Sequence, residues 1–92
     1  MSRDAKAETR AINQILWRDW DPIGCGVPED EYEDYVWPVY KLLIDRKPRA
    51  EIEAYLRWAA DEAIGVSIAD EKLQHVVDKL LALPIAPKEG LA

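Results

Sequence analysis

Apolar residues recur along this chain at intervals of three and four positions, the spacing of one face of an α-helix. The first run of this pattern predicts a helix from about Asp4 to Trp20. It ends at residues 21–24, Asp-Pro-Ile-Gly, which match the positional preferences of a type I turn. We expect Asp21 to accept hydrogen bonds from nearby backbone N–H groups and Ile23 to fold inward.

A second helix is predicted to begin at Pro28 and Glu29 and to continue to about Asp45. Proline suits the first turn of a helix because its missing N–H would be unpaired there, and acidic residues there face the positive end of the helix dipole. Pro38 lies inside this helix and removes one backbone hydrogen bond. Because the apolar face keeps its phase across Pro38, we expect one kinked helix and not two separate helices.

Two further helices are predicted in the second half of the chain. One covers about residues 50–64, and the other begins at Ser67–Asp70 and ends at Pro84. Gly65 suits the left-handed conformation that ends many helices, and Ser67–Asp70 contains a candidate capping box. No segment alternates between apolar and polar residues for long enough to predict a strand.

The four apolar faces predict an all-α fold, a small four-helix bundle-like single domain over residues 1–92. We expect an ordered core over residues 4–84 and a flexible tail over residues 85–92, because the end of the chain, PIAPKEGLA, is rich in proline and glycine. Glu53 and Arg57, four residues apart, are expected to pair on an outer helix face. The predicted core contains Ile12, Ile15, Leu16, Tyr35, Val36, Val39, Leu43, Ile52, Leu56, Ala59, Leu73, Val76, Val77 and Leu80.

Composition and charge limit the class of protein. The chain has 92 residues, 49% of them hydrophobic and 33% charged, which indicates one soluble domain. No apolar run approaches the about 18 residues of a membrane span, the N-terminus lacks a signal-peptide pattern, and a single cysteine excludes an internal disulfide framework. We therefore expect a cytoplasmic protein with no membrane partner.

Acidic residues are concentrated in residues 19–34, which contain seven acids and no base, within a chain of net charge −6. A phosphate backbone would be repelled by this segment, so we expect no nucleic-acid partner. The natural complement of such a surface is a basic protein.

Aromatic residues gather in the same region, because residues 17–40 hold three of the four tryptophans and three of the four tyrosines. Trp17, Trp37 and Trp58 lie off the apolar faces of their helices, so each either fills space between helices or belongs to an exposed patch. Helical spacing places Asp30, Glu33, Asp34 and Trp37 on one outer face. The candidate protein-binding residues are Trp17, Asp30, Glu33, Asp34 and Trp37.

No residue pattern predicts catalysis, a cofactor or a metal site. A loop that starts at Asp19 resembles part of a calcium-binding loop but lacks two of the required oxygen donors. His75 lies on the polar face of its helix, and Cys25 lies between two glycines, where it is either a dispensable or a reactive thiol. We expect no enzymatic activity, no cofactor and no bound metal.

Several segments together resemble a group of small bacterial proteins of unknown function, with the pattern L-W-x-x-W-D-P-I-G followed by D-E-Y-D-x-Y. These segments are ILWRDWDPIG, PEDEYEDYVWPVYKLL, EIEAYLRW and EAIGV. The similarity is strongest in the W-D-P-I-G and E-D-E-Y segments. It implies a helical, bacterial and cytoplasmic protein and no particular activity.

Two classes of function follow from these residues. The first is an acidic protein-interaction module of the inhibitor, immunity or adaptor type, which binds a basic protein partner through residues 17–40. The alternative is a small-molecule or metal-binding protein with a pocket between the first two helices. The oligomeric state is left open by the sequence.

Overall fold

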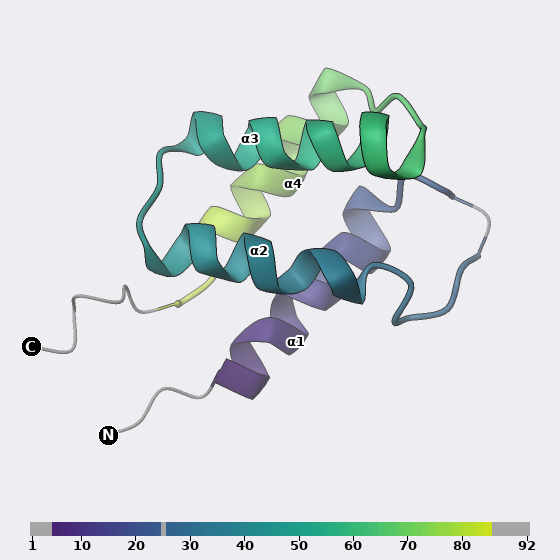
Figure 1. Ribbon diagram of the computed structural model, residues 1–92. Helices are drawn as coiled ribbons and strands as arrows, with labels where there is room; N and C mark the ends of the chain where they lie inside the picture. The colour runs from purple at the N-terminus through teal and green to yellow at the C-terminus, as the bar shows by residue number, and fades with distance from the viewer. Residues whose placement is uncertain (1–4, 25, 86–92) are drawn as a thin grey trace, which may run out of the picture.

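Four α-helices form the regular structure of the computed structural model, which describes residues 5–24 and 26–85 (Figure 1). They are α1 (Ala5–Ile15), α2 (Glu33–Ile44), α3 (Arg49–Trp58) and α4 (Asp70–Leu81). Two π-helical segments, η1 (Leu16–Trp20) and η2 (Ala59–Ile64), continue α1 and α3. No strand occurs in the two described ranges, which confirms the predicted all-α fold. The predictions for Asp4, Cys25 and residues 86–92 of the tail concern positions outside these ranges.

Contacts between the helices close into a ring, with α1 against α2, α2 against α3, α3 against α4, and α4 against α1. In Figure 1, α2 and α3 lie side by side and run in opposite directions, and α1 and α4 lie behind them. Every helix therefore turns one face toward a shared interior. Pro38 lies within α2, which continues on both sides of it, and the kink there stays a prediction.

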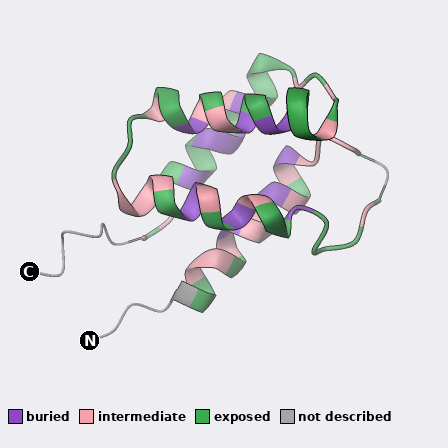
Figure 2. Ribbon diagram, in the orientation of Figure 1, coloured by how far each residue is buried: buried purple, intermediate pink, exposed green. Residues whose placement is uncertain are grey.

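The buried residues, purple in Figure 2, lie on the faces that the helices turn toward one another. All but three of the predicted core residues are buried; Ile15, Tyr35 and Leu43 are only partly buried and pack against the rim of the core. Trp20 and Tyr32 are fully buried, and they add large aromatic rings to the interior. Such rings each remove on the order of 150–250 Å² from water, so they contribute strongly to a core in so short a chain.

The predicted start of the second helix at Pro28 and Glu29 is wrong, because α2 begins at Glu33. Residues 29–32 form tight turns instead, with the N–H of Glu31 bonded to the carbonyl of Pro28 and the N–H of Glu33 bonded to that of Asp30. A regular helix would need the carbonyl of Glu29 to accept from Glu33. The side-chain amide of Asn13 occupies that carbonyl, at 3.0 Å.

At residues 21–24 the chain bends, with the expected bond to Asp21 and the expected inward Ile23, and a distant side chain contributes; the type I geometry stays a prediction. Gly24 N–H donates to Oδ1 of Asp21 at 3.1 Å, and Ile23 is half-buried against the core. The hydroxyl of Tyr32 donates to the same Oδ1 at 2.6 Å and accepts from the N–H of Ile23 at 3.1 Å. Tyr32 therefore fixes the turn from the far end of the loop.

Gly65 ends η2 in the left-handed conformation, with φ 89° and ψ 28°, which confirms its predicted role. The capping box predicted at Ser67–Asp70 is absent, since the residue before α4 is Ala69 and no described side chain caps the helix. The expected pair of Glu53 with Arg57 is also wrong. Each side chain binds a different partner, Arg49 at 2.8 Å for Glu53 and Asp70 at 2.9 Å for Arg57.

Candidate functional site

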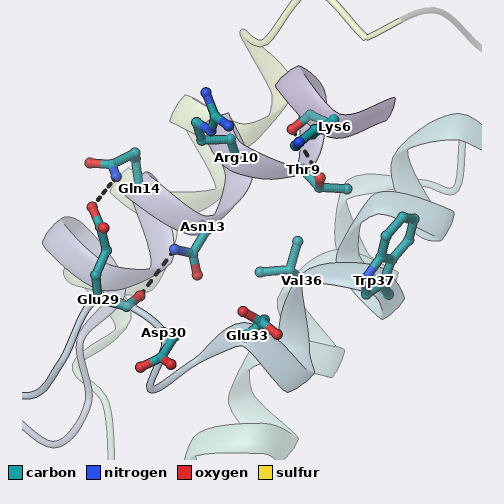
Figure 3. Close-up of a pocket in the computed structure, with 10 residues that line it drawn as sticks. All are labelled: Lys6, Thr9, Arg10, Asn13, Gln14, Glu29, Asp30, Glu33, Val36 and Trp37. Carbon is teal, nitrogen blue, oxygen red and sulfur yellow. Dashed lines mark hydrogen bonds between the residues drawn. The ribbon is translucent and has the colours of Figure 1, made fainter. Parts of the chain in front are cut away.

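A groove of about 570 Å³ lies between α1 and the segment that leads into α2 (Figure 3). The two walls run in opposite directions, because hydrogen bonds join Asn13 to Glu29 near one end and Tyr40 to Glu8 near the other. We refer to this feature as the α1–α2 groove. Its α1 wall consists of Lys6, Thr9, Arg10, Asn13 and Gln14, and its acidic wall consists of Glu29, Asp30, Glu33, Val36 and Trp37.

Two amide side chains of α1 hold the beginning of the acidic wall. Asn13 donates from Nδ2 to the backbone carbonyl of Glu29 at 3.0 Å, and Gln14 donates from Nε2 to the Glu29 carboxylate at 2.6 Å (Figure 3). The carboxylate of Glu29 is therefore engaged within the chain. It positions the wall, and because the amide of Gln14 is neutral, its negative charge adds to that of Asp30 and Glu33.

The carboxylates of Asp30 and Glu33 are exposed, and neither forms an ion pair or a side-chain hydrogen bond with any of the described residues. Lys6 and Arg10 on the opposite wall are likewise exposed and form no ion pair within the described ranges. The groove therefore presents unpaired charge of opposite sign along its two walls.

Trp37 projects outward from α2 at one end of the groove, and 58% of its surface is exposed. Its ring lies edge-on to that of Tyr40, with centroids 5.7 Å apart. Tyr40 is itself buried and donates to the carboxylate of Glu8 at 2.6 Å. A fixed neighbour thus supports a large exposed aromatic side chain beside two unpaired carboxylates, as the sequence predicted for this face.

Trp17 does not line the groove. It is half-buried, and its indole N–H donates to the backbone carbonyl of Val27 at 2.9 Å. The guanidinium of Arg18 lies 5.9 Å from the centre of its ring. Trp17 therefore holds the loop that leads into the acidic wall, and its position supports a structural role more than direct contact with a partner.

Asp34 is exposed on another flank of α2 and does not line the groove. Its negative charge lies close enough to Tyr55 of α3 to affect that residue: burial, then Tyr35 and then Asp34 raise the pKa of the Tyr55 phenol. Of the five candidate binding residues, the structure therefore brings together Asp30, Glu33 and Trp37. Asp34 lies toward α3.

A second exposed aromatic lies on α3, where Trp58 is 52% exposed and stacks obliquely on Tyr55 at 5.9 Å. A shallower groove of about 430 Å³ separates α2 from α3 nearby, with Pro38 and Tyr55 in its lining. Its charged rim holds lysines and acids in equal number, so it favours no charged partner.

Tyr32 lies behind the acidic wall, and its pKa is raised to about 12. Burial has the largest effect, and the hydrogen bond to Asp21 adds to it, while the N–H of Ile23 acts in the opposite direction. The phenol is therefore neutral at physiological pH and serves as a hydrogen-bond donor that holds the loop.

Within the described residues, no group of three or more His, Cys, Asp and Glu side chains is arranged to hold a metal ion. His75 is exposed on α4. None of the described helices has both the length and the apolar character needed to cross a bilayer.

No family model, no curated protein and no solved structure matches this chain. The resemblance to small bacterial proteins therefore stays a prediction.

The residues that sequence reasoning missed are those of the α1 wall. Lys6 and Arg10 are one helical turn apart, and Asn13 and Gln14 follow on the next turn. This spacing marks a polar face on the first helix. Its meaning depends on which segment packs beside it, and that information comes from the tertiary structure.

Proposed function

We propose that this chain is an acidic protein-interaction module of the inhibitor, immunity or adaptor type, carried on a four-helix bundle-like domain. It binds a basic protein partner through the acidic and aromatic part of residues 17–40. The observation that carries the proposal is an exposed Trp37 beside the unpaired carboxylates of Asp30 and Glu33.

These residues contribute to binding in different ways. Exposed carboxylates attract a basic surface over distances near the Debye length, so they raise the rate of association and make it dependent on salt. An aromatic side chain that becomes buried in a partner lengthens the life of the complex. Tryptophan is among the residues that contribute most to binding energy at interfaces. Trp37 packs edge-on against the ring of Tyr40, which supports it.

The test compares variants against a partner isolated with the wild-type chain at low salt. Glu33→Lys should slow association and weaken its dependence on salt, whereas Trp37→Ala should speed dissociation. Two variants serve as matched controls: Asp61→Lys makes the same charge change on exposed η2, and Trp58→Ala removes the other exposed tryptophan. Neither control should alter either rate by more than about twofold, since rim positions away from a contact contribute little.

Asp34→Lys tests whether the proposed binding surface extends toward α3. If the partner occupies the α1–α2 groove, this variant should behave like the Asp61→Lys control, because Asp34 lies toward α3. If Asp34→Lys weakens binding as much as Glu33→Lys, the partner also covers the α3 side of α2. A complex that is insensitive to Glu33→Lys, to Trp37→Ala and to salt would contradict the proposal.

A small-molecule site is the second candidate function, and the groove is the observation that favours it. Its volume of about 570 Å³ lies within the about 300–1,000 Å³ range of ligand pockets, and it lies between the first two helices. A thermal-shift screen with a metabolite set and with calcium and magnesium ions tests this candidate. A saturable rise in melting temperature that Glu33→Lys removes would support it over the protein partner.

A further inference from the structure

The α1–α2 groove is complementary in charge to itself. Lys6 and Arg10 stand on one wall and Asp30 and Glu33 on the other, and no ion pair crosses the groove between these described side chains. A second copy of the chain, turned over, therefore offers its basic wall to the acidic wall of the first. We infer that the partner of this groove is a second copy of the same chain, in a symmetric dimer, whose α1 wall supplies the basic surface. This inference rests on the proposed function, since it uses the same acidic wall.

The charge pattern selects the direction of the two-fold axis. An axis that runs along the groove places the α1 wall of each copy over the acidic wall of the other. An axis that runs across the groove would instead place the two α1 walls opposite each other, so that Lys6 and Arg10 would face like charges. Like charges in direct opposition are unfavourable, so the axis runs along the groove.

A two-fold axis along the groove preserves the position of each residue along its length. The antiparallel walls have two fixed points, the bond of Asn13 to Glu29 and the bond of Tyr40 to Glu8. A side chain between these points therefore meets partner residues that lie at its own level in the groove.

This rule identifies the contacts across the dimer. In sequence, Arg10 lies between Glu8 and Asn13 on one wall, and Glu33 lies between Glu29 and Tyr40 on the other. This geometry brings Arg10 of each copy toward Glu33 of the other. Lys6 lies at the end of the groove that carries Trp37. Its ammonium group is then placed against the exposed indole of the other copy, in a cation–π contact.

A small, charged interface of this kind gives a weak dimer. Apart from Trp37, the lining is mostly polar, and the net charge of −6 repels the two copies at long range. Interfaces of small area support transient association, so we expect a Kd between about 10 μM and about 1 mM.

Sedimentation equilibrium and NMR diffusion, at chain concentrations from about 1 μM to about 2 mM, measure this association directly. Arg10→Glu and Glu33→Arg should each weaken it by about tenfold or more, because symmetry makes every change act twice. Glu33→Arg makes the net charge less negative, so general repulsion would predict stronger association for this variant. Local pairing predicts weaker association.

An equimolar mixture of Arg10→Glu and Glu33→Arg supplies the decisive measurement. In the mixed dimer every reversed side chain meets a reversed side chain of opposite sign, so association should return to near the wild-type level. The double variant should also dimerise with itself. Lys47→Glu is the matched control for Arg10→Glu, because it makes the same charge change at an exposed position outside the groove. It should leave association within about twofold of wild type.

Two outcomes overturn the inference. One is a wild-type chain that remains monomeric up to about 2 mM, a concentration above the expected Kd. The other is an equimolar mixture of the two reversed variants that associates no more strongly than either variant alone. Neither outcome contradicts the proposed function, because salt-dependent binding of a different basic protein through Glu33 and Trp37 is measured in a separate experiment.

Discussion

Replacement of Tyr32 by Phe removes one buried hydroxyl group and keeps the aromatic ring. The hydroxyl donates to the carboxylate of Asp21 at 2.6 Å and accepts from the N–H of Ile23 at 3.1 Å. A hydrogen bond to a charged group contributes about 1.5–3 kcal/mol and an ordinary one about 0.5–1.5 kcal/mol. We therefore expect Tyr32→Phe to lower the free energy of unfolding by about 2–4 kcal/mol.

Thermal and urea unfolding, followed by tryptophan fluorescence and circular dichroism, measure this loss. For a chain of this length the melting temperature should fall by roughly 10–25 °C. The matched control is Tyr35→Phe, because Tyr32 and Tyr35 both pack edge-on against Trp20, with centroids 5.3 and 5.6 Å away. The hydroxyl of Tyr35 forms no hydrogen bond with the described residues, so its removal should change stability by less than about 0.5 kcal/mol. Equal effects of the two substitutions would refute the assignment of stability to these two bonds.

Other predictions concern pH, the core and the exposed aromatics. The pKa of Tyr32 is about 12 in the folded chain against 10.0 for an ordinary tyrosine. The contribution of the neutral phenol to the free energy of unfolding is therefore fully present below pH 10 and is lost as the pH rises toward 12. The difference in stability between wild type and Tyr32→Phe should shrink over that range. Leu56→Ala, at a fully buried position, should lower the free energy of unfolding by about 2–5 kcal/mol in urea titrations. Asp21→Ala removes the charged acceptor of two bonds, those of Gly24 and Tyr32, and should lower the free energy of unfolding by about 3 kcal/mol or more. Trp37→Ala should leave the melting temperature within a few degrees of wild type; a collapse of the fold would place this ring in the core.

Helical periodicity predicts most of this fold because each helix buries one continuous face. Ile12, Leu16, Ile52 and Leu56 follow the three-and-four spacing, and all four are fully buried. Gly65 was predictable for a different reason, since its left-handed backbone conformation is costly for residues with a side chain. Both kinds of signal are local, so the sequence carries them without knowledge of the tertiary contacts.

The features that the sequence did not predict depend on distant partners. η1 and η2 are π-helical, with bonds five residues apart from the N–H of Asp21 to Leu16 and from the N–H of Gly65 to Ala60, and no sequence pattern distinguished them from an α-helix. Arg57 was expected to bind Glu53 on its own helix. Arg57 instead binds an acid of α4, because tertiary partners compete with neighbours one turn away.

The candidate site shows the same division between local and distant information. The outward orientation of Glu33 and Trp37 follows from helical spacing, whereas Asp30 lies in the turns before α2; the structure places all three on the groove. The position of Asp34 toward α3 and the contribution of the α1 wall require knowledge of which helices are neighbours. Sequence reasoning therefore found one wall of the groove and missed the other.

The start of α2 and the α1–α2 groove both involve contacts of α1 with Glu29. Asn13 donates to the carbonyl of Glu29, and the segment up to Glu33 forms turns instead of the first turn of a helix. Gln14 donates to the carboxylate of the same residue, whereas the carboxylates of Asp30 and Glu33 form no side-chain hydrogen bond with the described residues. Two amide side chains of α1 thus hold the beginning of the opposite wall and bind one of its carboxylates, that of Glu29. The binding surface belongs to both segments, and a change at either amide should alter recognition even though neither residue carries charge.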